Sequence, residues 1–248
     1  MHGIYLGEEF GASDLQLGGI ITAEGERVFH LVRVLRVTPG EKIAIFNGRG
    51  EIWVGEVQKD TKSSILVVRI LEKKVMQKMH NLDLAMGTTK REAFEEVVKM
   101  AVELGYQRLI PLKTTFSQRL KLNVERTERL VESAIIQSNN PFFLSIEPET
   151  TLQEVVKAYD IVMYFTEKLD QMLQKQNQQL WSGIEPLKSK ILLIIGPEAG
   201  LSSEEETFLL SLKNSSSIHL PAYLMRCPTA VCTATGFVFS KLMLGKFA

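Results

Sequence analysis

Short runs of alternating apolar and polar residues fill the first 72 positions of the chain. This period of two predicts β-strands, and Asn47-Gly48-Arg49-Gly50 between two of the runs is typical of a hairpin turn. The stretch 29–37 is interpreted as a short helix that ends at Pro39-Gly40. Closely spaced short strands suggest a small β-barrel. The strands are predicted at 42–46, 51–57 and 64–71.

The pattern of apolar and polar residues changes after the polar stretch 73–81, which we interpret as a linker. From residue 82 to 248 continuous apolar runs alternate with amphipathic stretches, which predicts a parallel α/β domain. A Gln- and Lys-rich stretch around 171–180 favours a helix or a flexible segment. Strands are predicted at 82–86, 108–112, 161–165, 191–195 and 217–220, and helices at 92–104, 124–136 and 229–247.

One of these apolar runs, 191–195, breaks into Gly196-Pro197-Glu198-Ala199-Gly200. Ser202 and Glu205 follow at the spacing of a capping box, so a helix should begin there. Loops at the carboxyl ends of parallel strands are where open α/β sheets usually bind ligands. The loop therefore indicates either a ligand site or a tight strand-to-helix connection.

A second loop of interest, 220–230, leads into the last predicted helix. Leu224 and Met225 are apolar and stand beside Arg226, a composition that suits the lining of a ligand pocket with one cation nearby. Pro221 and Pro228 also fit a plain surface turn. Both interpretations are open from the residues alone.

Composition narrows the class of protein. Apolar residues make up 45 % and charged residues 23 %, as in ordinary globular proteins, and no apolar run approaches the roughly 20 residues that a membrane span needs. The first residues do not resemble a signal peptide, and two cysteines offer no disulfide framework, so a reducing cytoplasm is expected. The four histidines are scattered, and no metal site is assigned. Twenty-nine basic and 29 acidic residues cancel, so any RNA binding requires a local basic patch.

The two loops together resemble the paired signature of SPOUT methyltransferases. The chain is most similar to the RsmE family, which uses S-adenosylmethionine to methylate N3 of a uridine in 16S ribosomal RNA of the small subunit. Residues 29–50 resemble the PUA-like domain of that family, and Lys90 and Glu95 match a further motif. The resemblance implies a PUA-like β-barrel over 1–72 and a trefoil-knotted SPOUT domain over 82–248.

The same resemblance implies a site and partners. Arg226 would stabilise the negative charge that develops as N3 of uridine loses its proton; alternatively it pairs with Glu198 and holds the loop. The partners would be 16S rRNA in the small subunit and a second copy of the chain, bound through the helix 229–239, with no membrane. The residues expected to bind the cofactor are Phe165, Thr166, Ile195, Gly196, Pro197, Glu198, Gly200, Leu220, Leu224, Met225, Arg226 and Thr229.

Several positions depart from the pattern of the family. Tyr223 stands where an arginine is expected and Pro228 where a glutamate is expected, while Ala93, Met100 and Asn140 replace basic residues. These losses indicate that the chain binds RNA more weakly or differently. Two other functions remain open: a SPOUT enzyme that modifies another RNA, and a ribosome-binding or assembly protein that has lost catalysis.

Overall fold

The computed structural model describes residues 1–7, 16–58, 65–166, 184–220 and 222–244. The chain forms two compact units. The first contains residues 1–77 together with 131–143, and the second contains 78–130 together with 144–248. The sequence pattern does not predict that 131–143 belongs with the first unit. Long-range contacts place it there: Arg27 pairs with Glu132, and Ile136 packs close to Gly3.

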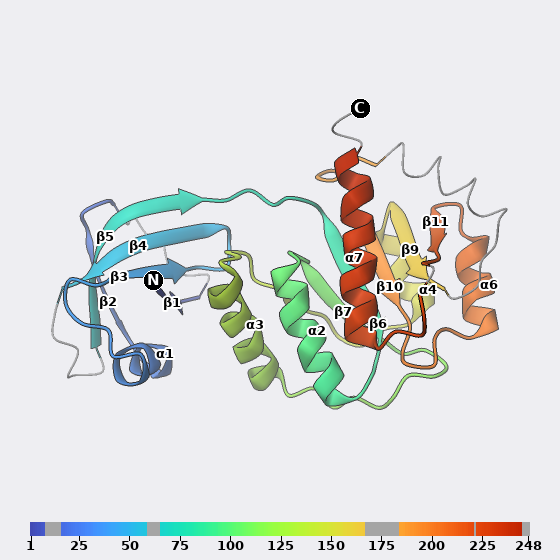
Figure 1. The fold of residues 1–248 in the computed structure, drawn as a ribbon, viewed down its shortest axis with the longest axis horizontal. Helices are drawn as coiled ribbons and strands as arrows, with labels where there is room; N and C mark the ends of the chain where they lie inside the picture. Colours follow the sequence, from blue (N-terminus) through green and yellow to red (C-terminus); the bar gives the residue numbers. More distant parts are fainter. Residues whose placement is uncertain (8–15, 59–64, 167–183, 221, 245–248) are drawn as a thin grey trace. The chain divides into compact units, whose positions relative to one another are not determined.

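The first unit is built on a curled five-stranded sheet with the order β1-β3-β4-β5-β2 (Figure 1). The predicted strands 42–46 and 51–57 are confirmed, and β3 and β4 pair as an antiparallel hairpin. The predicted helix 29–37 is wrong in extent, because α1 (Glu26–Phe29) passes into one π-helical turn (His30–Val34). The strands are β1 (His2–Tyr5), β2 (Ile20–Glu24), β3 (Lys42–Phe46), β4 (Glu51–Val57) and β5 (Ile65–Val75).

The second unit contains a six-stranded sheet in which every neighbouring pair is parallel, with the order β11-β9-β10-β6-β7-β8. Continuous apolar runs predicted this arrangement correctly, because strands covered on both faces need no polar side. The last strand lies two residues earlier than the predicted 217–220, and β8 was not predicted. The strands are β6 (Leu82–Gly87), β7 (Arg108–Leu112), β8 (Ser145–Ile146), β9 (Ile161–Phe165), β10 (Ile191–Ile195) and β11 (Ser215–Ile218).

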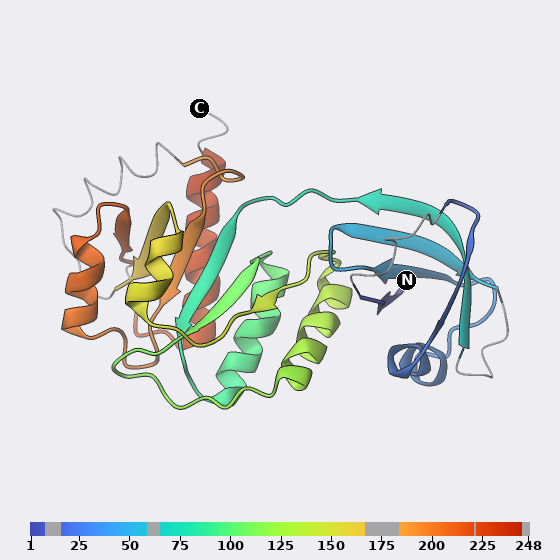
Figure 2. The same ribbon diagram turned by 180° about the vertical axis from the view of Figure 1, so that it is seen from behind.

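Helices cover both faces of this sheet. On one face α2 packs against α7, and on the other α4 and α6 share an apolar cluster with β6, β7, β9 and β10 (Figures 1 and 2). None of the described helices is long and apolar enough to cross a bilayer. The predicted segment 171–180 lies outside the described residues. The helices are α2 (Arg91–Glu103), α3 (Val124–Ser138), α4 (Leu152–Val155), α6 (Ser203–Ser211) and α7 (Cys227–Leu244), and a 3-10 turn (Val156–Ala158) extends α4.

Two buried contacts fix α7, the helix that enters the sheet region from the loop 220–226. The hydroxyls of Tyr106 and Thr235 lie 2.5 Å apart in a fully buried hydrogen bond. The rings of His80 and Phe239 pack with their centroids 4.9 Å apart. Both contacts join α7 to residues just before the amino-terminal ends of β6 and β7, so they hold the middle and the carboxyl-terminal part of the helix at that edge of the sheet.

The buried ring of His80 predicts a pH-dependent stability. Burial lowers the pKa of His80 below its ordinary value near 6.5, so the unfolded chain takes up a proton that the folded chain resists. The free energy of unfolding should therefore be fully retained above about pH 6.5 and fall as the pH drops through the window below it. Urea unfolding of wild type and His80→Gln across this window checks the expectation. The difference in free energy of unfolding between the two proteins should shrink as the pH falls. A difference that stays constant with pH would exclude His80 as the cause of the pH dependence.

Candidate functional site

Three strands end side by side at the carboxyl edge of the parallel sheet. β9 pairs with β10 on one side and with β11 on the other, and all three run in the same direction. Described residues at the end of β9, in the loops after β10 and β11, and at the starts of α6 and α7 line a cavity of about 680 Å³. This is the edge at which doubly wound sheets place their ligands.

The loop after β10 brings its own backbone into close contact. The amide of Gly200 donates to the carbonyl of Pro197 at 2.8 Å, and Gly200 has a φ of 76°, which favours glycine. A Cβ on Gly196 would lie 2.9 Å from the carbonyl carbon of Gly200, and one on Gly87 would lie 2.6 Å from the nitrogen of Pro197. Three glycines are therefore needed to fold the loop against the end of β6.

Helix α6 begins directly after this loop with the predicted capping box. The Ser202 hydroxyl accepts from the Glu205 amide at 3.3 Å, and the Glu205 carboxylate accepts from the Ser202 amide at 2.8 Å. The other carboxylate oxygen of Glu205 accepts from the amide of Thr115 at 2.7 Å and from its hydroxyl at 3.1 Å. One side chain thus joins the start of α6 to the loop after β7.

Polar groups at the end of β9 form another part of the wall. Thr166 donates from its hydroxyl to Glu206 at 2.8 Å, and its amide donates to the carbonyl of Ile218 at 3.1 Å. Nδ1 of His219 lies 3.4 Å from the carbonyl oxygen of Thr166. Glu206 and His219 both line the cavity, and neither is among the residues predicted from the sequence to bind the cofactor.

The third loop and the start of α7 close the cavity. Leu224 and Met225 line it, and Tyr223, which is 98 % exposed, stands at its mouth. Burial, together with the charge of Glu198, raises the pKa of the Cys227 thiol to about 12. The thiol is therefore protonated at neutral pH, which argues against a thiolate nucleophile in this cavity.

Arg226 and Thr229 are the two predicted residues that are not among the described residues lining the cavity. Both are exposed; Arg226 immediately precedes α7, and its carbonyl accepts from the amide of Ala230 at 2.9 Å. Within the described part of the chain the Arg226 guanidinium has no ion pair or hydrogen bond, so the alternative in which it pairs with Glu198 has no support.

The structure brings the other predicted residues together around one space. Those that line the cavity are Phe165, Thr166, Ile195, Gly196, Pro197, Glu198, Gly200, Leu220, Leu224 and Met225. Five further lining residues, Ala199, Ala222, Tyr223, Cys227 and Ala230, lie within the predicted loops 196–200 and 220–230, and three lie outside them: Leu201, Glu206 and His219. Leu201 and His219 immediately adjoin the predicted loops, so extending each loop by one residue would have included them, whereas Glu206 lies further along the chain, in α6.

The lining combines apolar side chains, backbone groups at glycine, and two carboxylates, Glu198 and Glu206. No Lys or Arg occurs among the described residues that line the cavity. Such a wall suits a ligand with a flat apolar ring and a positive charge. The described residues also contain no group of three or more His, Cys, Asp or Glu side chains that could hold a metal ion.

Comparisons with known families agree with both units. Residues 76–238 match the family model described as an RNA methyltransferase domain, and residues 23–68 match the one described as an RNA methyltransferase PUA domain. The chain is 29 % identical over 213 residues to a ribosomal RNA small subunit methyltransferase E of Rickettsia conorii, covering 86 % of each chain. It is 24 % identical over 219 residues to the protein of the same name in Bacillus subtilis, covering 83 % of this chain and 84 % of that one.

Solved structures share the fold. A ribosomal RNA small subunit methyltransferase E from Neisseria gonorrhoeae, bound to S-adenosyl methionine, superposes with a TM-score of 0.76 at 20 % identity, covering 97 % of both chains. A methyltransferase of Legionella pneumophila in complex with the same cofactor gives a TM-score of 0.76 at 21 % identity, again covering 97 % of both chains.

Proposed function

The chain belongs to the RNA methyltransferase family, because the model of the methyltransferase domain matches about two thirds of it. From this premise we propose that the protein uses S-adenosylmethionine to methylate N3 of a uridine in 16S ribosomal RNA of the small subunit. The observation that carries the proposal is the cavity at the carboxyl ends of β9, β10 and β11. Its size and mixed lining suit a nucleoside with a charged side chain.

The residues of the cavity fit this cofactor in two respects. Gly196 and Gly200 leave the backbone uncovered, so amide and carbonyl groups can approach an adenine edge, while Phe165, Leu224 and Met225 supply apolar surface for the ring. Glu198 and Glu206 supply negative charge for a cation. When bound, S-adenosylmethionine supplies a methyl group already activated by its sulfonium.

The chain's own residues would then position the base and manage charge. In-line placement of two reactants accounts for much of the rate in such transfers. Uridine becomes negatively charged as N3 gives up its proton, and Arg226, exposed at the start of α7, is the cation we propose to stabilise that charge. The trefoil knot implied by the resemblance stays a prediction.

The first unit would help to dock the substrate. It matches the PUA domain of RNA methyltransferases over residues 23–68, so we propose that it contacts ribosomal RNA in the small subunit, in the cytoplasm. A neutral chain gains little from long-range attraction to phosphates. A large folded substrate that contacts both units would offset this.

Mass spectrometry of ribosomal RNA tests the proposal directly. Small-subunit RNA from a strain without the gene should lack one methylated uridine, and purified protein with S-adenosylmethionine should restore it. Methylation of a different RNA in these experiments would favour the alternative of a SPOUT enzyme that modifies another RNA. Cofactor binding measured by calorimetry separates these enzymes from a degenerate assembly protein, which should bind ribosomes and no S-adenosylmethionine.

We also propose a homodimer in which α7 forms part of the interface. Its outward positions Cys232, Thr233 and Gly236 are small and exposed, and a Cβ on Gly236 would meet no atom within 4 Å in the single chain. Two-fold dimers are the commonest oligomers, and small side chains allow helices to approach closely.

Light scattering should give a dimer for wild type and for the control Ser211→Arg, and a monomer for Gly236→Arg. A wild-type monomer at micromolar concentration would exclude the interface.

A further inference from the structure

The loop 113–121, which follows β7, is held rigidly although most of its residues are exposed. Ser117 is at its centre: the hydroxyl accepts from the amide of Thr88 at 3.2 Å and from the amide of Thr114 at 3.0 Å, and it donates to the carbonyl of Leu112 at 2.8 Å. The hydroxyl of Thr114 lies 2.8 Å from it. One serine therefore closes the loop on the last residue of its own strand.

Two further connections fix the loop from outside. The amide of Gln118 donates to the carbonyl of Thr88 at 2.9 Å, and the hydroxyl of Thr88 donates to the carbonyl of Gln118 at 2.6 Å. Thr115 donates twice to Glu205 in the first turn of α6. The loop is thus joined to the end of β6 on one side and to the start of α6 on the other.

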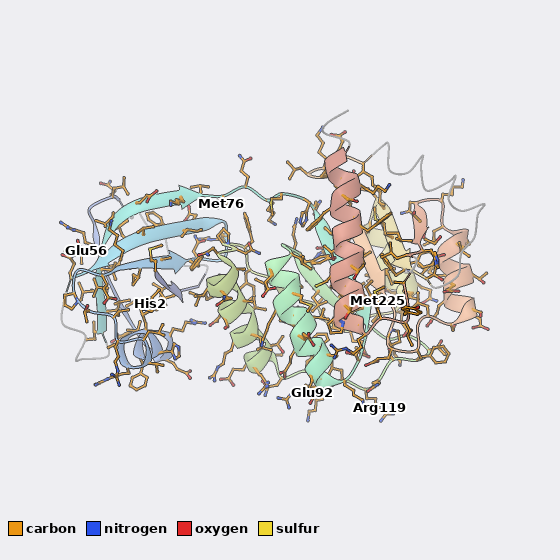
Figure 3. All side chains as sticks on the ribbon, viewed as in Figure 1. His2, Glu56, Met76, Glu92, Arg119 and Met225 are labelled. Atoms are coloured by element: carbon orange, nitrogen blue, oxygen red, sulfur yellow. The ribbon has the colours of Figure 1, made fainter. Side chains whose placement is uncertain are left out.

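These connections place the loop beside the rim of the cofactor cavity. Glu205 lies four residues beyond Leu201, which lines the cavity, and Thr88 follows Gly87, which packs against Pro197. Figure 3 shows Arg119 of the loop at the end of the domain where Met225 of the cavity also lies. A molecule whose reacting base enters the cavity would have its flanking part near this loop.

The side chains that the loop presents to solvent are an aromatic ring and cations. Phe116 is 48 % exposed. Arg119 is exposed, and among the described residues its guanidinium has no ion pair or hydrogen bond. Lys113 and Lys121 are exposed as well, and the nine residues 113–121 contain no acidic residue. The loop is therefore a local positive surface on a chain whose basic and acidic residues are equal in number overall.

We propose that the loop 113–121 binds single-stranded RNA next to the target uridine, with Phe116 stacking on a neighbouring base and Arg119 contacting a phosphate. Proteins read unpaired RNA by stacking bases on aromatic side chains and neutralising the backbone with Arg or Lys. A loop already fixed by hydrogen bonds loses little conformational freedom on binding. This inference rests on the proposed function, since it assumes that RNA is the substrate.

Two variants separate the two roles. Phe116→Leu keeps an apolar side chain and removes the aromatic face, and Arg119→Gln removes one charge. Leu210→Ala and Lys213→Gln are matched controls, an exposed apolar residue on α6 and an exposed cation beyond it. The probes are a fluorescein-labelled uridine-rich RNA oligonucleotide, followed by anisotropy over a range of salt concentrations, and small subunits from a strain lacking the gene, for which KM is measured.

Phe116→Leu should weaken oligonucleotide binding about tenfold without changing its salt dependence. Arg119→Gln should lower the slope of log affinity against log salt by about 0.7, the contribution of one phosphate contact on a single strand. Both variants should raise KM for small subunits and leave S-adenosylmethionine affinity within about twofold of wild type.

Three results would overturn the inference. The variants could match their controls in both RNA assays, the wild type could show no measurable affinity for the oligonucleotide, or both variants could lose cofactor affinity and thermal stability together, which would make the loop a support for the cavity. Failure of the proposed function looks different, because wild-type protein would then transfer no methyl group to small subunits whatever the loop contains.

Discussion

Gly196→Ala is expected to lower the rate of methyl transfer by about 100-fold or more. The added Cβ would lie 2.9 Å from the carbonyl carbon and 3.1 Å from the Cα of Gly200, and 3.1 Å from the nitrogen of Leu201. All three atoms are backbone, so no side chain can rotate away, and the turn between Pro197 and Gly200 must open. A displacement near 1 Å at a reacting centre can cost on the order of 10²-fold in rate.

The measurement is single-turnover methylation of small subunits, together with cofactor affinity by calorimetry. Gly87→Ala is the companion variant, since its Cβ would press on Pro197 from the other side of the same loop. Both variants should lose cofactor affinity while their melting transitions stay cooperative, because overpacking one loop costs about 1–3 kcal/mol. Normal affinity in a folded Gly196→Ala protein would remove this loop from the binding site.

Most strands of the parallel sheet were predictable because they are runs of mainly apolar residues, which indicates burial on both faces. Five branched residues in a row over 191–195 have no polar side, so they fit a strand covered on both faces, and β10 is fully buried as expected. The capping box of Ser202 and Glu205 is equally local. Such features depend on neighbours within a few positions, and the sequence shows those neighbours.

Features that depend on distant residues were missed. Nothing near β8 predicts a two-residue strand, whose partner β7 lies more than 30 positions away. The grouping of 131–143 with the first unit likewise depends on contacts with residues near 3 and 27. The sequence predicts an amphipathic helix there, and only the folded chain shows what its apolar side meets.

In the candidate site too, features set by neighbouring residues could be predicted and features set by distant residues could not. Its loops could be selected because each follows an apolar strand, and ten of the twelve predicted cofactor residues lie around one cavity. Glu206 could not be selected, because its place in the wall depends on Thr166, which is 40 residues away in the chain. The bracing of 113–121 by Glu205 depends on a contact across 90 residues.

Arg226→Ala is expected to reduce methylation of small subunits about 10²–10³-fold, the typical cost of removing one donor that stabilises developing negative charge. Arg226 is exposed immediately before α7, between Met225 and Cys227, which both line the cavity. Because the guanidinium itself is not among the described groups of the lining, it should contribute little to cofactor binding. Affinity for S-adenosylmethionine should therefore stay within a few-fold of wild type.

Two matched variants refine this expectation. Arg226→Lys keeps the positive charge and loses the planar fork of donors, so it should recover part of the rate if charge is what the base needs. Lys213→Gln removes an exposed cation beyond α6 and should leave the rate unchanged. The assay is single-turnover methyl transfer with saturating cofactor, which separates chemistry from cofactor binding.

The outcome distinguishes a group that acts on the substrate from one that holds the loop. Within the described residues no carboxylate pairs with Arg226, and the nearest candidate from the sequence, Glu198, instead contributes to the raised pKa of Cys227. Removal of the Arg226 side chain should therefore leave the melting temperature of the protein unchanged. If cofactor affinity and melting temperature fall together, the arginine holds the loop in place; if Arg226→Ala methylates at the wild-type rate, another group stabilises the uridine anion.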